Sequence, residues 1–167
     1  GDPTNDLAGC DIESSLGYAY NGSRTDSEVE RYFTPPSIGY DLLAGPAIPA
    51  PGDSAIVNFR RRYGVRNLGM TSFGSTGTGE PYSFPSGGDY ASATGLWWKV
   101  LRGYAPLWPT IGPTDVEYLS GPYPPSRFRF DGDPVRHIGN IDGLGTQWSL
   151  APGDRRLVLA SGPFQLA

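Results

Sequence analysis

Short apolar or alternating runs dominate the hydrophobic pattern of the chain. In residues 127–130 charged and aromatic side chains alternate, as in a strand with one exposed and one buried face. Two Pro-Gly-Asp turns, at 51–53 and 152–154, each lead into an apolar segment. These signals predict strands over the following ranges: 16–20, 55–59, 70–73, 127–130 and 157–160.

One segment has a different period. Between Asp89 and Arg102, apolar residues recur every three or four positions, which is typical of an amphipathic helix. Asp89 can cap its start and Gly103 can end it. Trp97 fits its apolar face. We therefore predict a mainly β fold, a loop-rich β-sandwich-like architecture with one short helix at about 89–102.

Composition supports a folded chain with many loops. The 24 glycines and 17 prolines make up about a quarter of the 167 residues, too many for a helical bundle. Aromatic residues reach 13%, whereas disordered chains are poor in aromatics. No stretch approaches the ~18 consecutive apolar residues of a membrane helix, so we expect no membrane insertion.

Charge and catalytic motifs narrow the function classes. The net charge of −4 gives no basic field for nucleic acid, so we expect no nucleic-acid partner. The run Arg60–Arg62 is either a solvated strand end or a contact for an anionic partner. His137 is the only histidine. Two interpretations of it are open: it belongs to a Cys10–His137 or Ser–His137–Asp catalytic arrangement, or it is an exposed histidine and Cys10 is a small buried residue. We expect the chain to have no enzymatic activity.

Two groups of oxygen ligands are the strongest chemical signal. Calcium prefers about six to eight oxygens supplied by flexible loops. The same residues are also typical caps of tight turns. The candidate calcium ligands are, in the first group, Asp2, Asn5, Asp6 and Asp11, with Glu13 beside them, and, in the second, Asp131 and Asp133, with Asn140 and Asp142 beside them.

Several aromatic and hydroxyl-bearing positions suit surface roles. Trp98, Trp108 and Tyr123 are candidates for a surface that holds a glycan or another protein chain. Asn21 lies in an N-glycosylation sequon, and Ser54 lies in a short O-glycosylation pattern, Asp-Ser-Ala.

Several phrases of the sequence, taken in order, carry a family resemblance. They are DLAGCD at 6–11, LGYAYNG at 16–22, FDGDPV at 130–135 and DRRLVLASGPF at 154–164. This order resembles the large secreted and cell-surface proteins of Bacteroidota and related phyla, which often carry a type IX secretion sorting domain. The resemblance implies an extracellular or cell-surface location and a chain that continues beyond residue 167. We expect residues 1–167 to form one β-rich domain or a fragment of a longer chain.

Two functional interpretations follow from these observations. The first is a non-enzymatic extracellular structural or adhesive module, ordered by calcium, that assembles with other copies of itself, with the rest of its parent chain or with a surface partner. The alternative is a carbohydrate-binding module or part of a polysaccharide-degrading enzyme. In that case Trp98, Trp108 and Tyr123 would stack on sugars, and Asp131 and Asp133 would act as acids.

Overall fold

The computed structural model describes residues 5–23, 35–77, 90–105, 117–120, 123–143 and 151–165. These residues are mainly β, with one short helix among them. Its elements are β1 (Asp6–Asp11), β2 (Leu16–Asn21), β3 (Ile38–Asp41), β4 (Ala47–Val57), β5 (Arg60–Asn67), β6 (Ser72–Gly77), α1 (Tyr90–Leu101), β7 (Tyr118–Ser120), β8 (Tyr123–Ser126) and β9 (Arg155–Ala160). Within these ranges no helix has the length and apolar character needed to cross a membrane.

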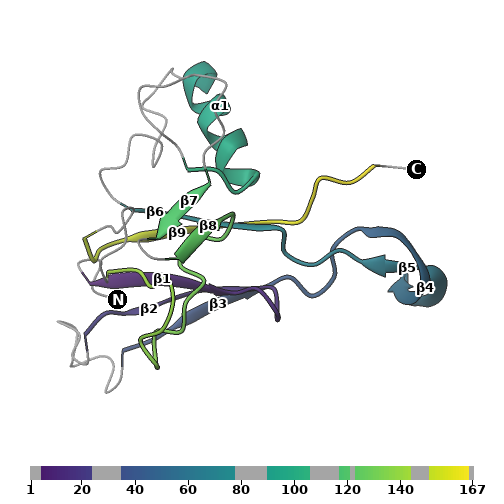
Figure 1. Cartoon of the computed structure of the whole chain (residues 1–167), viewed down its shortest axis with the longest axis horizontal. Helices are drawn as coiled ribbons and strands as arrows, with labels where there is room; N and C mark the ends of the chain where they lie inside the picture. The colour runs from purple at the N-terminus through teal and green to yellow at the C-terminus, as the bar shows by residue number, and fades with distance from the viewer. Residues whose placement is uncertain are drawn as a thin grey trace.

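Two small antiparallel sheets form a sandwich at the centre of the molecule. One sheet has the strand order β1-β2-β3, and the other pairs β6 with β9. Figure 1 shows these two sheets as layers, with α1 as a third layer on the far side of β6 and β9. Strand β9 contacts both β1 and β2 across the interface. The predicted β-sandwich-like architecture with one helix is therefore confirmed.

The core between the two sheets is built around Phe73. This side chain of β6 is completely buried and packs with Cys10 of β1 and with Met70. A Cβ atom at Gly17 of β2 would lie 2.7 Å from the Phe73 ring, so only glycine allows the sheets to approach this closely. Cys10 is a small buried residue, as the sequence predicts.

Helix α1 packs on β9 through one face. Leu96 and Val100 are buried and contact Val158. Gly103, with a φ of +78°, follows the helix and lets the chain turn away, which confirms its predicted role as the helix end. The predicted cap Asp89 lies outside the described residues.

The predicted strand at 127–130 is wrong. Phe128 forms only an isolated bridge to Phe73, and Phe130 has a φ of +60°, which interrupts the extended chain. Arg129, expected on an exposed face, is buried. Its guanidinium lies over the rings of Tyr118 and Phe130, 5.5 and 4.9 Å from their centroids, and its charge is thus accommodated inside the protein.

The two Pro-Gly segments behave differently from each other. The segment 152–154 leads into β9, as predicted. Gly52, in contrast, lies inside β4, where a φ of +91° and a register shift between Pro49 and Ser54 mark a bulge rather than a chain reversal. The strand predicted at 70–73 begins at Ser72 instead and continues to Gly77.

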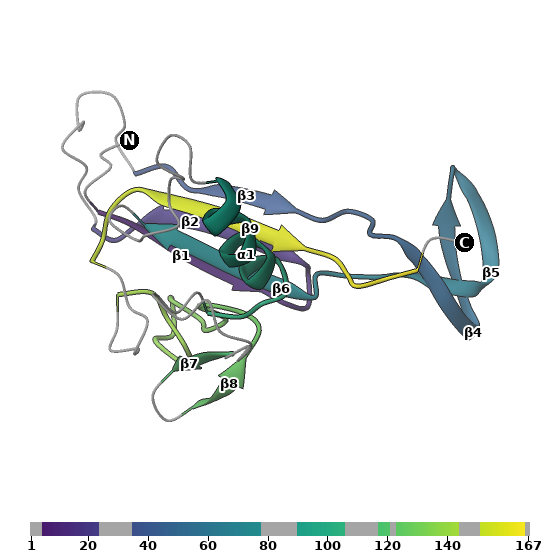
Figure 2. The same ribbon diagram turned by 90° about the horizontal axis from the view of Figure 1, so that it is seen from above.

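Strands β4 and β5 form a long hairpin that projects from the sandwich (Figures 1 and 2). We call this hairpin, residues 47–67, the arm. The chain reverses at Asn58 and Phe59, whose φ angles are +52° and +60°. Two consecutive positive φ angles are typical of a type I′ turn, the tight turn that matches the twist of a hairpin. The strand predicted at 55–59 therefore ends at Val57.

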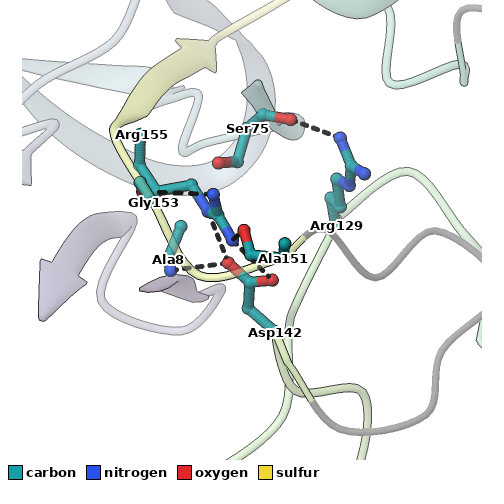
Figure 3. A network of polar contacts seen from close by, with 7 residues as sticks. All are labelled: Ala8, Ser75, Arg129, Asp142, Ala151, Gly153 and Arg155. Atoms are coloured by element: carbon teal, nitrogen blue, oxygen red, sulfur yellow. Dashed lines mark hydrogen bonds and ion pairs between the residues drawn. The ribbon is translucent and has the colours of Figure 1, made fainter. Parts of the chain in front are cut away.

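Asp142 and Arg155 form a buried ion pair that joins three segments (Figure 3). Arg155 Nε donates to Asp142 Oδ2 over 2.8 Å, and Nη2 donates to Oδ1 over 3.3 Å. The backbone N–H of Ala8 in β1 donates to the same Oδ2 over 2.9 Å. Arg155 also donates to the carbonyls of Ala151 and Gly153. The pair thus connects β1, the segment around Asp142 and the start of β9.

We expect Asp142→Ala to lower the free energy of unfolding by about 3–5 kcal/mol, because it leaves a buried guanidinium without its carboxylate. Urea denaturation measures this loss. Asp154→Ala is the matched control, since its partner Arg156 lies 3.4 Å away in a half-exposed pair. The control should lose less than about 1 kcal/mol. Equal losses in the two variants would contradict the role of the buried pair.

Candidate functional site

The first predicted calcium group is spread along β1. Asp6 and Asp11 stand at opposite ends of this six-residue strand. The Asp11 carboxylate accepts hydrogen bonds from the Glu13 N–H over 3.0 Å and from the Ser14 hydroxyl over 2.8 Å. Asp11 therefore caps the turn between β1 and β2, which is the alternative role open to it from the sequence.

The other members of this group are placed as follows. Asn5 donates through Nδ2 to the Ser23 hydroxyl over 3.0 Å, and Asp2 lies outside the described residues. Over the described ranges, no three His, Cys, Asp or Glu side chains gather closely enough to hold a metal ion. Calcium binding stays a prediction from the sequence.

Asp131 and Asp133, the second group, lie in different environments. Burial raises the pKa of Asp131, although the Ser126 hydroxyl donates to this carboxylate over 3.1 Å. The pKa of Asp133 is lowered, mainly by hydrogen bonds from the N–H groups of Arg136, over 3.0 Å, and Val135, over 2.9 Å.

Both carboxyl groups line one cleft, which we call the acidic cleft. It lies between the β1–β2 turn and residues 131–135, has a volume of about 670 Å³ and is also lined by Asp11, Ile12 and Glu13. Opposite pKa shifts in one cleft are what acid–base chemistry needs. A polysaccharide-degrading role for Asp131 and Asp133 stays a prediction.

Cys10 and His137 lie in different environments. Cys10 is buried in the core, and burial raises the pKa of its thiol, which favours the unreactive neutral form. His137 is exposed in the loop that follows Asp133, where its φ is +55°.

Of the predicted surface aromatic residues, Trp98 is 61% exposed on α1, whereas its neighbour Trp97 is half-buried. Trp108 lies outside the described residues. Tyr123 begins β8, and its side chain is not among those described. The two glycosylation candidates are half-buried: Asn21 ends β2, and Ser54 lies in β4. Their modification stays a prediction.

Trp98 borders a groove at the C-terminal end of α1, which we call the aromatic groove. Its volume is about 510 Å³. It is lined by Thr71, Ser72, Trp98, Leu101, Arg102, Tyr104, Arg127 and residues 160–164. Two guanidinium groups stack on the Tyr104 ring, that of Arg102 at 5.0 Å and that of Arg127 at 5.3 Å from its centroid. The groove thus combines aromatic faces with planar cationic donors.

The arm carries the second notable surface. Phe59 at its tip is fully exposed, Tyr63 is 79% exposed and Ile56 is 55% exposed. Ile56 lies opposite Arg61, and Tyr63 lies two residues further along β5. The side chains of Ile56, Arg61 and Tyr63 therefore share one face of the hairpin. We call these three residues, together with Phe59 at the tip, the arm face.

Sequence reasoning missed the arm face because it placed Asn58 and Phe59 at the end of a strand. Two features could have revealed the turn. Asparagine is favoured at the first position of a type I′ turn. The pair Asn58-Phe59 is also preceded by an apolar run, 55–57, and followed by Arg60–Arg62. The phenylalanine at the second position, where glycine is usual, concealed the signal.

Comparisons with protein-family models, with curated proteins and with solved structures find no significant match for this chain. The fold and its surfaces therefore define the class by themselves. It is a mainly β protein with a small sandwich, a covering helix and a projecting hairpin arm.

We expect Asp131→Asn to be at least as stable as the wild type at pH 7. The ionised Asp131 carboxylate opposes folding because its folded-state pKa is raised, and this cost disappears as the pH falls below the ordinary Asp value of about 3.9. The difference in unfolding free energy between variant and wild type should therefore shrink between pH 7 and pH 3.

Asp133→Asn is the matched control with the opposite sign. A lowered pKa stabilises the folded protein above the ordinary value, and that contribution is lost as the pH falls through the folded-state pKa. This variant should be less stable than the wild type at pH 7 and equal to it in acid. Urea titrations at a series of pH values measure both differences; parallel pH profiles for the two variants would contradict the assignment.

Proposed function

We propose that this chain is a non-enzymatic structural or adhesive module, which assembles by placing its arm on a second copy of itself. The observation that carries the proposal is Phe59. A bulky side chain at positive φ is a rare conformation that costs about 1–2 kcal/mol, and glycine would remove the cost. Backbone strain of this kind is found more often at functional sites than elsewhere in a protein.

The other residues of the arm face support the same role. Tyr63 and Ile56 are exposed beside Arg61, and aromatic residues and arginine are enriched at the centre of protein interfaces. The arm extends away from the sandwich (Figure 2), so this face is accessible to another molecule.

Charge favours a second copy as the partner. The arm contains four arginines and one aspartate, a net charge of +3, while the whole chain has a net charge of −4. The rest of the chain therefore carries −7. A basic arm and an acidic body attract each other between copies, and this complementarity steers association.

The acidic cleft offers a counterpart with matching chemistry. Asp11 and Glu13 are exposed beside it, and so are the apolar side chains of Ile12 and Val135. An arm from one copy would meet carboxylates with Arg61 and apolar side chains with Phe59. Such a contact joins two different surfaces, so it generates open chains of copies rather than closed dimers unless the geometry returns on itself.

The exported location is part of the same proposal and is supported by the family resemblance of the sequence phrases. The 17 prolines of the chain also suit an assembly of this kind, because a proline loses little further freedom when a partner covers it.

We expect Phe59→Gly to abolish concentration-dependent assembly while leaving the hairpin intact, because glycine suits the turn but removes the exposed ring. Sedimentation velocity over a concentration series measures assembly, and hydrogen exchange of the β4 and β5 amides measures the hairpin. Leu43→Ser, which removes another exposed apolar side chain outside the arm, is the control and should assemble like the wild type.

Two outcomes would overturn this proposal. The first is a wild-type protein that stays monomeric at its highest soluble concentration. The second is a Phe59→Gly variant that assembles as well as the wild type.

We expect Arg61→Gln to weaken assembly more than Arg62→Gln. Arg61 shares its face with Ile56 and Tyr63, whereas Arg62 points to the other face of the hairpin. Assembly of the wild type should also weaken from low salt to about 0.5 M salt, because ions screen exposed charges. Sedimentation at each salt concentration tests both points. Equal effects of the two variants would show that only the net charge of the arm matters for assembly. That result would contradict docking through one defined face.

A further inference from the structure

The aromatic groove is separate from the arm, and its size and lining suit a bound ligand. Its volume of about 510 Å³ falls within the range of small-ligand pockets, about 300–1,000 Å³. Trp98 and Phe164 are 61% and 43% exposed at the groove, so ring faces are available to a ligand. Arg102 follows Trp98 by four residues, just past the last turn of α1, which brings an aromatic and a cationic side chain to one face.

The cationic side of the groove is held in place by several interactions. Arg127 donates through Nε to Glu117 over 3.2 Å and through Nη2 to the Tyr104 hydroxyl over 3.1 Å. Arg102 stacks on the same Tyr104 ring. Two guanidinium planes are thus fixed by one tyrosine, and a guanidinium suits paired hydrogen bonds to a carboxylate.

The wall formed by residues 160–164 is also held in place. The Thr71 hydroxyl accepts a hydrogen bond from the Gly162 N–H over 2.9 Å and donates to the Ala160 carbonyl over 3.3 Å. The Ser161 hydroxyl lies 3.1 Å and 3.0 Å from the carbonyl oxygens of Leu68 and Gly69. A ligand would therefore bind to a preformed groove, which lowers the entropic cost of binding.

We propose that the aromatic groove binds a carbohydrate chain that carries carboxylates, such as a polymer of uronic acid. A pyranose ring has an apolar face that matches Trp98 and Phe164, and its carboxylate complements the charge of Arg102, which lies beside the Arg127–Glu117 ion pair. A nucleic acid also has flat apolar faces and negative charge, so single-stranded DNA enters the test as the competing ligand.

Affinity electrophoresis in gels containing polygalacturonic acid tests the proposal. The wild type should be retarded by this polymer and not by hydroxyethylcellulose, a neutral polymer. Trp98→Ala should weaken binding about tenfold, the factor that corresponds to about 1.4 kcal/mol. Arg102→Gln should weaken retardation by the acidic polymer. Thermal unfolding of both variants checks that they fold.

Phe59→Gly is the control that separates this inference from the assembly proposal, since it alters the arm and leaves the groove unchanged. It should be retarded as strongly as the wild type. Absence of wild-type retardation, equal retardation by the neutral polymer, or full retardation of Trp98→Ala would overturn the inference. Binding of single-stranded DNA in place of polygalacturonic acid would also overturn it and would assign the groove to nucleic acid.

Discussion

The buried ion pair between Asp142 and Arg155 is the interaction on which the rest of the structure depends. It fixes the start of β9 against β1, and β9 in turn covers one sheet of the sandwich and carries α1 on its other face. Two charges removed from water are tolerated here because further hydrogen bonds satisfy them: a backbone N–H donates to the carboxylate, and two backbone carbonyls accept from the guanidinium. The position of β9 is therefore set by the pairing of these hydrogen-bond donors and acceptors as well as by apolar burial.

The arm obeys a different constraint. It lies outside the sandwich core, and its strands are held mainly by pairing with each other. A hairpin of this kind gains little from its own core, because a two-stranded ribbon has no second layer to cover it. The strained Phe59 at the tip adds a further cost. A partner surface that covers the arm face would supply the burial that the isolated arm lacks.

The arm face and the aromatic groove are separate surfaces with different chemistry. The arm face presents side chains on a thin hairpin, which suits another protein surface. The aromatic groove is concave and is built where α1, the start of β6 and residues 160–164 meet, which suits a narrow chain. A module that holds a second copy with one surface and an acidic glycan with the other would join a protein assembly to a polysaccharide layer. The lining of the aromatic groove contains no residue of the arm, so the two roles can be tested separately.

By itself the sequence determined the mainly β class, the position of α1 and the exposure of Trp98, because each depends on local periodicity or on turn residues. Tertiary structure alone decided the roles of the charged residues. Arg129 and Asp142 are buried, although charged residues are usually exposed. The rings of Tyr118 and Phe130 and the carbonyl of Ser75 contact the Arg129 guanidinium, and Arg155 pairs with Asp142. Asp6 and Asp11, close in sequence, are held apart by the extension of β1, since a strand separates its ends instead of gathering them.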